Sequence, residues 1–300
     1  MDAVGVIGVG AMGSAMAGHL VDAGFRVIGY DVEPGRLAEL ARRGGIAGGS
    51  CREVVGRADV VITSLPSVAA FDQVVAEVGE AAPAGLAVAE TSTLPLGAKE
   101  RGRELLAARD VTLLDCPLSG TGQQAKTKDV VVYASGDHAT VDRFGPIFDG
   151  FARRWCDVGA FGAGSRLKFV ANLLVAVHNA STAEALLLAR KAGLDLDLVL
   201  DVVADGAGTS RMFEIRGPQM ARRAYEDAGI QTRTFQKDIE IIAEFARSHD
   251  CPVPLFAAAS QLYTAALGQG RDHQDTACVH EVLAGMAGVA DVTDNQSEEP

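Results

Sequence analysis

The stretch VGVIGVGAMGSAMAGHLVDAG, at residues 4–24, decides the fold of the N-terminal half. It opens with a Val- and Ile-rich run of strand length and continues from residue 11 with a helical pattern. Gly8, Gly10 and Gly13 form a GxGxxG turn between the two parts. A strand, a glycine turn and a helix in this order predict the first βαβ unit of a dinucleotide-binding domain.

Each glycine of this turn has a physical role in binding a dinucleotide. The first permits the tight turn, the second lets the backbone approach a pyrophosphate, and the third allows the helix to pack closely on its strand. The helix N-terminus then faces the anion. We therefore expect a cofactor-binding loop made of Gly8, Val9, Gly10, Ala11, Met12 and Gly13.

The end of the next apolar run, RVIGYD at residues 26–31, indicates which dinucleotide binds. Asp31 stands where a carboxylate accepts hydrogen bonds from the adenosine ribose hydroxyls and repels a 2′-phosphate. NAD is therefore the expected cofactor and NADP the weaker alternative, although Arg36 lies close enough in sequence to soften the preference. A glycine turn followed by an incidental aspartate is the competing interpretation.

Further apolar runs at 59–65, 86–91 and 111–116 alternate with helical patterns. Their weak polar alternation is typical of parallel strands that helices cover on both faces. This alternation of strand and helix patterns predicts an α/β fold with a Rossmann-type, doubly wound, mostly parallel sheet. Loops at the carboxyl ends of the third and fourth strands are expected to add cofactor contacts from Leu65, Pro66 and Thr93, unless they are ordinary strand-end turns.

The pattern changes after two more strand candidates, at 130–136 and 154–159. A glycine-rich hinge, GAFGAGS at 159–165, leads into one long helix from about Arg166 to Ala192, and all later segments have helical patterns. We expect a Rossmann domain at 1–160, an all-α C-terminal domain at 161–288 entered through the long interdomain helix, and a disordered acidic tail at 289–300.

Composition excludes several functional classes. The net charge of −12 argues against a nucleic-acid-binding surface, which needs clustered cations. The five cysteines lack zinc-ligand or disulfide-framework spacing, so no metal site is expected and a reducing, cytoplasmic location fits. The N-terminus shows no export signal, and apolar runs such as ANLLVAV at 171–177 are too short to cross a bilayer, so we expect a soluble protein.

Several motifs, taken together, resemble the β-hydroxyacid dehydrogenase family, which includes 3-hydroxyisobutyrate dehydrogenase, tartronate semialdehyde reductase and the cofactor domain of 6-phosphogluconate dehydrogenase. The resemblance extends from residue 1 to about residue 285. It rests on motifs in the family's order, namely GVIGVGAMGSAMAGHL (5–20), ETSTLP (90–95), DCPLSGTGQQA (115–125), GAGSRLKFVAN (162–172), EALLLARKAGLD (184–195) and KDIEIIAEFA (237–246).

The resemblance implies a reaction and roles for individual residues. Lys168 corresponds to the family's general acid/base, whose pKa must fall from about 10.4 toward roughly 7–8, as burial in a closed cleft would cause. Asn172 lies one helical turn on and would position the substrate. Ser119, Gly120 and Thr121 correspond to the loop that binds the substrate carboxylate, and Lys237 to a lysine near the cofactor. Without the resemblance, Lys168 would pass for a solvated surface lysine. The alternative interpretation of Lys237 is a solvated surface pair with Asp238.

Departures from the family pattern leave the substrate open. The loop has Thr121 where many members have glycine, Lys128-Asp129 replaces a common Gly-Thr, and Ala171 replaces the first of two asparagines. The expected partner is a small carboxylate-bearing substrate. An imine reductase of the same fold is one alternative, disfavoured by Lys168, and a non-catalytic NAD(P)-binding scaffold is another. The long apolar helix predicts a homodimer or homotetramer, and the resemblance implies the same because members of the family commonly form dimers or tetramers.

Overall fold

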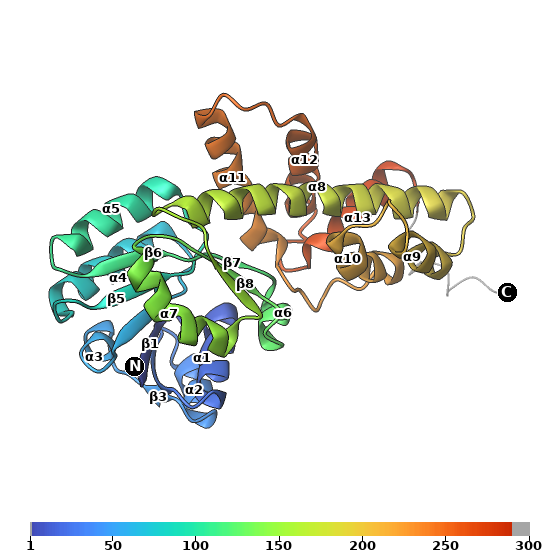
Figure 1. Cartoon of the computed structure of the whole chain (residues 1–300). Coiled ribbons are helices and arrows are strands. Elements are labelled where there is room, and N and C mark those ends of the chain that lie inside the picture. The colour runs from blue at the N-terminus through green and yellow to red at the C-terminus, as the bar shows by residue number, and fades with distance from the viewer. Residues whose placement is uncertain (1, 290–300) are drawn as a thin grey trace. The chain divides into compact units, whose positions relative to one another are not determined.

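A computed structural model describes residues 2–289 and divides the chain into two compact units, Met1–Val170 and Ala171–Pro300 (Figure 1). The division falls inside a long helix, whereas the sequence placed the domain boundary at residue 160. The expected acidic tail at 289–300 lies, apart from Val289, outside the described residues.

A six-stranded, all-parallel sheet forms the centre of the first unit, in the order β3-β2-β1-β4-β5-β6. The order reverses beside β1, and ligands of open α/β sheets bind at such a switch point, outside the carboxyl ends of the strands. This topology confirms the predicted Rossmann-type sheet. The strands are β1 (Ala3–Ile7), β2 (Arg26–Tyr30), β3 (Ile46–Ala47), β4 (Val60–Thr63), β5 (Ala87–Glu90) and β6 (Thr112–Asp115).

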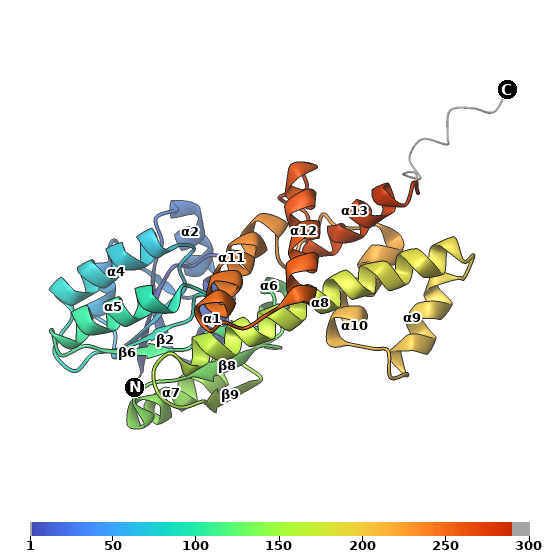
Figure 2. The same ribbon diagram turned by 90° about the horizontal axis from the view of Figure 1, so that it is seen from above.

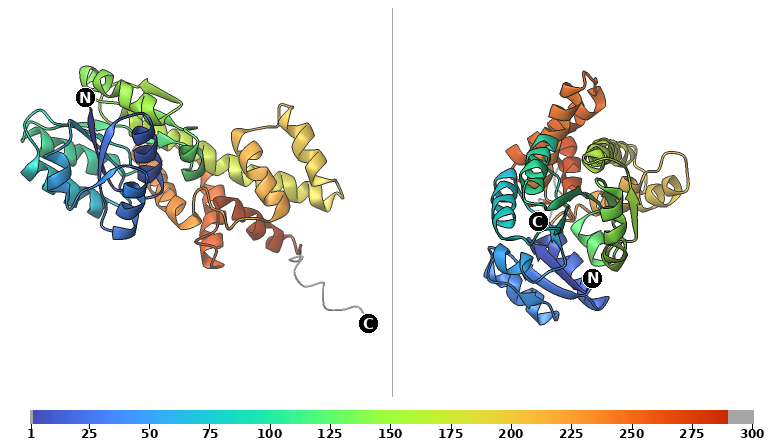
Figure 3. Two further views of the ribbon diagram at one scale, coloured as in Figure 1. Left: turned by 90° about the horizontal axis from the view of Figure 1, so that it is seen from below. Right: turned by 60° about the vertical axis from the view of Figure 1, so that its left-hand side comes forward.

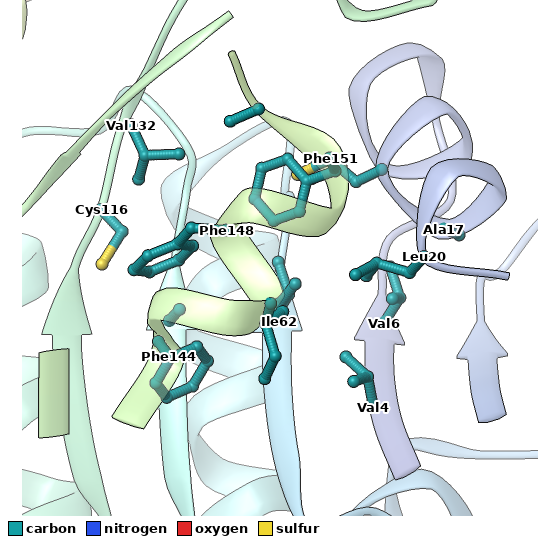
Figure 4. Close-up of a cluster of buried hydrophobic side chains, with 14 of the residues drawn as sticks. Val4, Val6, Ala17, Leu20, Ile62, Cys116, Val132, Phe144, Phe148 and Phe151 are labelled. Carbon is teal, nitrogen blue, oxygen red and sulfur yellow. The ribbon is translucent and has the colours of Figure 1, made fainter. Parts of the chain in front are cut away.

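Two hydrophobic cores cover the two faces of this sheet because side chains alternate along each strand. Val4 and Val6 of β1 belong to the core formed with α1 and α7, whereas Ala3 and Ile7 belong to the core on the opposite face. Figure 4 shows the first core, with Leu20 and the phenylalanines of α7 against the strands. The helices of this unit are α1 (Ala11–Asp22), α2 (Pro34–Arg42), α3 (Cys51–Val55), α4 (Val68–Ala81), α5 (Leu96–Ala107), α6 (Gly122–Lys126) and α7 (His138–Phe151).

The last two predicted strands form a separate small sheet with a third strand that the sequence did not reveal. β8 (Val131–Ala134) pairs antiparallel with β7 (Leu118–Ser119) and parallel with β9 (Arg154–Asp157). An isolated bridge between Asp115 and Ser135 joins this sheet to the end of β6. Both β3 and β7 contain only two residues, too few to produce a hydrophobic period.

The long helix α8 runs over Ala163–Lys191 and confirms the predicted element. Its start corrects one expectation, because Ala163, Gly164 and Ser165, assigned to a glycine-rich hinge, form its first turn. The amides of Gly164 and Ser165 donate to side chains of Ser135 and Asp115. These capping groups are distant in sequence, so the local pattern could not show where the helix begins.

The second unit is helical, which confirms the predicted all-α domain. Figures 2 and 3 show α9 and α10 alongside the C-terminal part of α8, where Arg190 donates to the Ala221 carbonyl at 3.2 Å. Asn179 of α8 is buried and donates to the Tyr263 hydroxyl at 3.0 Å and the Thr276 carbonyl at 2.8 Å. The elements are α9 (Leu196–Ala204), α10 (Arg211–Arg222), α11 (Thr232–Ser248), α12 (Pro254–Gly268), η1 (Thr276–Cys278) and α13 (Val279–Met286).

By length and composition alone, α8 is apolar enough to cross a membrane. However, 44% of its most apolar window is buried inside the protein. The buried hydrogen bonds of Asn179 also belong to this helix. These contacts are those of the central helix of a packed helical domain.

Candidate active site

The glycine loop after β1 has the geometry of a pyrophosphate site. Gly8 has φ +90°, and a Cβ there would lie 2.2 Å from the Ser64 carbonyl oxygen. A Cβ on Gly13 would lie 1.9 Å from the carbonyl oxygen of Gly8. At Gly10 the nearest protein atom would be Nη1 of Arg36, at 3.7 Å, so the fold itself does not require a glycine there. The absence of a side chain at Gly10, the second glycine of the turn, thus fits the close approach of a ligand rather than a need of the protein's own packing.

The N-terminus of α1 is also suited to an anion. Gly10 is its N-cap, and no side chain caps the helix. The first amides of a helix lack intrahelical acceptors and carry the positive end of the helix dipole. Glycine loop and helix terminus together fit the pyrophosphate of a dinucleotide.

Asp31 lies next to this loop, as predicted, but its carboxylate already has several partners. Oδ2 accepts from the Val9 amide at 2.8 Å and Oδ1 from the Glu33 amide at 2.9 Å. Arg36 pairs with the same carboxylate at 3.2 Å, and its side chain is half exposed. Asp31 therefore stabilises the glycine loop itself, and the guanidinium of Arg36 partly neutralises its charge.

A buried carboxylate, Glu90, organises the loops after β4 and β5. It accepts hydrogen bonds from the Thr63 hydroxyl and, at 2.7 Å, from the Ser92 amide. The Ser92 hydroxyl in turn accepts from the Leu65 amide at 2.7 Å. These bonds join the Leu65-Pro66 loop to the loop that carries Thr93, so two segments predicted to contact the cofactor form one hydrogen-bonded edge. Glu90 was not among the predicted site residues, although a charged residue at the end of an apolar strand is a usable signal.

The predicted carboxylate loop follows β6 and begins with β7. Gly120 has φ +142°, a conformation that favours glycine, and a Cβ there would lie 2.7 Å from Cγ1 of Val130. Thr121 is the N-cap of α6 and forms a capping box with Gln124. The Thr121 amide donates to the Gln124 side chain and its hydroxyl accepts from the Gln124 amide, so the start of α6 fixes the end of this loop.

Lys168 lies in the first unit, in the second turn of α8. The turn before it is held by Asp115, the last residue of β6, whose carboxylate accepts from the Ser165 amide at 2.7 Å. The lysine is buried. The helix therefore starts at the carboxyl edge of the parallel sheet, where β1 and β4 also end. Asp115 holds this turn in place, although no local sequence pattern indicated it.

Asn172 and Lys237 belong to the second unit. The Asn172 side-chain amide donates to Oδ2 of Asp238 at 2.8 Å, and both residues are buried. Because a carboxylate only accepts, this bond turns the carbonyl oxygen of Asn172 away from Asp238. Lys237 forms an ion pair with Oδ1 of Asp238 at 3.1 Å, the pairing considered from the sequence. Asp238 is a further residue that the sequence analysis did not assign.

No cluster of three or more metal-ligating side chains is found within residues 2–289. His178 lies in α8, where its carbonyl oxygen accepts from Ser181 and Thr182. It forms part of none of the polar clusters described above.

Two successive parts of the chain match two families of known proteins. Residues 3–160 match the NAD binding domain of 6-phosphogluconate dehydrogenase, and residues 162–283 match the NAD-binding family of NADP-dependent 3-hydroxyisobutyrate dehydrogenase. The chain belongs to the β-hydroxyacid dehydrogenase family. It is an NAD(P)-dependent dehydrogenase that acts on CH–OH groups, as the sequence analysis predicted.

Individual members of the β-hydroxyacid dehydrogenase family match along almost their whole length. L-threonate dehydrogenase of Cupriavidus necator is 33% identical over 287 residues, which cover 94% of this chain and 96% of that protein. The crystal structure of a 3-hydroxyisobutyrate dehydrogenase from Salmonella typhimurium has a TM-score of 0.86 at 32% identity, covering 94% of this chain and 100% of that one.

Imine reductases are more distant. That of Pseudomonas sp. has a TM-score of 0.61 at 19% identity, covering 94% of this chain and 99% of its own. Such a match shows a shared fold and no more.

Proposed function

We propose that the protein transfers hydride between NAD and the hydroxyl carbon of a small β-hydroxy acid, with Lys168 as general acid/base. The observation that carries this proposal is the position of Lys168, because α8 is tied through Asp115 to the same sheet whose strand ends carry the glycine loop. Bound NAD supplies the hydride acceptor for the alcohol carbon. The hydroxyl proton must then leave, and the amine of Lys168 takes it.

The cofactor is assigned to the predicted loops. Gly8 to Gly13 hold the pyrophosphate, Asp31 faces the adenosine ribose, and Leu65, Pro66 and Thr93 contact the nicotinamide half. Lys237 is assigned to the cofactor as well. Two observations support the assignment of these loops. The N-terminus of α1 has no side-chain cap, and the bonds of Glu90 and Ser92 join the loop after β4 to the loop after β5. A preference for NAD follows from Asp31, whose charge disfavours a 2′-phosphate.

The substrate is assigned to Asn172 and to the loop after β6. Asp238 holds the amide of Asn172, which leaves the carbonyl oxygen of that side chain to accept from the substrate hydroxyl. The Ser119 hydroxyl and the Gly120 amide bind the substrate carboxylate. Thr121 completes the substrate loop, and its capping box with Gln124 fixes the end of that loop.

The relatives narrow the substrate class without naming the compound. They include dehydrogenases of L-threonate and of 2-(hydroxymethyl)glutarate and a glyoxylate/succinic semialdehyde reductase, whose substrates all carry a carboxylate. We extend this shared chemistry to the present chain as a short hydroxy acid or its semialdehyde. Imine reduction is the second candidate, and the distance of the imine reductases disfavours it.

Replacing Lys168 with alanine tests the proposal. Initial rates are measured with threonate, 3-hydroxyisobutyrate, glycerate and 4-hydroxybutyrate, each with NAD and NADP. We expect NAD-linked oxidation of at least one acid, and a fall in kcat of about 10²–10⁴-fold in Lys168→Ala with an unchanged Kd for NADH. Lys191→Ala, at the other end of α8, is the control. Reduction of cyclic imines without oxidation of any acid, or full turnover by Lys168→Ala, would contradict the proposal.

We also infer a homodimer or homotetramer and a cytoplasmic location. The described part of the helical unit leaves Leu188, Leu194, Leu198 and Val202 exposed, and α9 buries none of its residues. A symmetric partner would cover such a surface. Light scattering of the purified protein tests the oligomer, and a monomeric mass would refute it. Cell fractionation tests the location.

A further inference from the structure

A second buried polar cluster of the first unit surrounds Asp115 at the end of β6. Its Oδ1 accepts from Nζ of Lys99 and from the Ser165 hydroxyl, both at 2.8 Å. Its Oδ2 accepts from the Ser165 amide at 2.7 Å. The side chains of Lys99 and Asp115 are both fully buried. One carboxylate thus links α5, the central sheet and the first turn of α8.

The first turn of α8 has acceptors for all of its initial amides. Those of Ala163 and Arg166 donate to backbone carbonyls of residues 160 and 162. The amide of Gly164 donates to the Ser135 hydroxyl at 3.0 Å, and that of Ser165 donates to Asp115. Since the first amides of a helix normally lack partners, this turn is attached to strand ends through side chains of the sheet.

The backbone at the start of α8 packs closely against the strand ends. A Cβ on Gly164 would lie 2.4 Å from the Tyr133 carbonyl oxygen and 2.8 Å from that of Asp115. The carboxylate of Asp115 also lies at the positive end of the helix dipole, which favours a negative charge. Packing and electrostatics therefore both fix the position and rotation of the first turn.

A buried ion pair is a poor device for stability alone. The cost of removing Lys99 and Asp115 from water is several kcal/mol per ion by general estimate, and apolar residues of similar volume often stabilise a protein more. Such a pair does define geometry. Any movement that separates the two groups leaves each of them buried as an unpaired charge, which is costly. Here the geometry it defines is that of the turn immediately before Lys168, which lies three residues after Ser165 and hence on the same helix face.

We propose that Lys99, Asp115 and Ser165 are positioning residues that hold the first turn of α8 on the sheet and thereby set the place from which Lys168 acts. The inference rests on the proposed role of Lys168. Lys99 pairs with the carboxylate of Asp115 at 2.8 Å, and Asp115 accepts from both the amide and the hydroxyl of Ser165. A reacting group must stand within hydrogen-bond reach of its proton, so a small rotation of this turn lowers kcat more than it lowers binding.

The first test is Ser165→Ala in the full-length protein, which removes one hydroxyl and leaves the ion pair intact. We expect kcat to fall about tenfold, with the Kd for NADH and the KM for the acid within about twofold of wild type. Ser165→Thr restores the hydroxyl and should recover most of kcat. Deuterium exchange of a peptide spanning residues 160–168 should be faster in Ser165→Ala than in wild type, and this readout does not depend on turnover.

Two further variants separate positioning from stability. Ser50→Ala removes a hydroxyl of the same type, which caps α3 by accepting from the Glu53 amide, and should leave kcat unchanged. The double variant Lys99→Met with Asp115→Asn removes both charges together, so that neither is left unpaired. It should keep NADH binding while lowering kcat at least as much as Ser165→Ala.

Two results would overturn the inference. The first is that Ser165→Ala and the double variant both have the same kcat and the same deuterium exchange of the 160–168 peptide as the wild type. The second is a kcat loss in Ser165→Ala that Ser165→Thr fails to restore although it is equally stable. Lys168→Ala, assayed in parallel, identifies failure of the proposed function itself, because full activity there removes the role of Lys168 while the exchange data still report on the helix start.

Discussion

The two units bury their charged side chains in different places. In the first unit, Glu90 and Asp115 end parallel strands and bond to the segments that follow them. In the second, Arg216, Asp275 and Glu281 join helices and loops that are far apart in sequence. In the sheet domain these charges fix the segments at the carboxyl edge, where open α/β sheets bind ligands, whereas in the helical domain Arg216, Asp275 and Glu281 join separate helices and loops.

The largest effect on stability should come from Asp275→Ala in the helical unit. Asp275 is buried, pairs with Arg216 at 3.0 Å and accepts from the amides of Gly229 and Ala277. Leaving Arg216 buried without its partner should lower the free energy of unfolding by about 3–5 kcal/mol. Calorimetry measures this loss, and the NADH Kd below the transition should stay close to that of wild type.

A matched exposed pair supplies the control for Asp275. Arg233→Ala breaks the ion pair with Asp272, in which the arginine side chain is 68% exposed, and should change stability by less than about 1 kcal/mol. Equal losses in the two variants would remove the distinction between the buried and the exposed charges of this unit.

An intermediate, pH-dependent effect is expected from Glu281→Gln. Burial alone would raise the pKa of Glu281, but hydrogen bonds from His280, Arg223 and Tyr225 outweigh it and hold the pKa well below its usual value. A depressed folded pKa contributes stability above the unfolded value of about 4.3, and this contribution is lost as the pH falls through the folded pKa. At pH 7 the variant should therefore be less stable by about 1–3 kcal/mol.

Urea unfolding at several pH values tests the sign of this effect. The difference between wild type and Glu281→Gln should be constant between about pH 5 and 7 and should shrink at lower pH. A difference that grows on acidification would show that Glu281 is not held in its charged form by Arg223 and Tyr225.

The smallest effect concerns the first unit and the choice of cofactor. Arg36 partly neutralises Asp31 and lies nearest to the Cβ position of Gly10, so it is the cation best placed to tolerate a 2′-phosphate. Arg36→Ala should raise the Kd for NADPH relative to NADH by about tenfold and leave the fold unchanged. Fluorescence titration measures both constants, with Arg42→Ala on the same helix as the control. An unchanged ratio would show that Arg36 has no part in selectivity.

Much of the first unit was predictable because its determinants are local. The glycine loop, the apolar runs and the long helix each follow from residues close together in the chain, and the structure contains all of them. The elements missed, β3 and β7, are two residues long. The start of α8 was placed three residues too late because its capping groups, Ser135 and Asp115, belong to earlier segments.

The candidate site was predictable only in part, for the same reason. Motifs identified Lys168, Asn172 and the glycine loop, since family patterns are linear. They did not identify three charged residues whose contacts are made across the fold. Glu90 accepts from the Ser92 amide, Lys99 pairs with Asp115, and Asp238 accepts from the side chain of Asn172. Thr121 was singled out by its motif position, but its capping box with Gln124 became visible only in the structure.

The sequence by itself determined the parallel sheet, the dinucleotide loop, the helical second domain and the family, because strand period, helix period and glycine requirements are properties of neighbouring residues. Only the tertiary structure decided that Arg36 neutralises Asp31, that Asp238 orients Asn172, and that Asp115 holds the start of α8 from fifty residues away. Hydrogen bonds and ion pairs act over about 3 Å, and which groups come that close is settled by packing rather than by position in the chain.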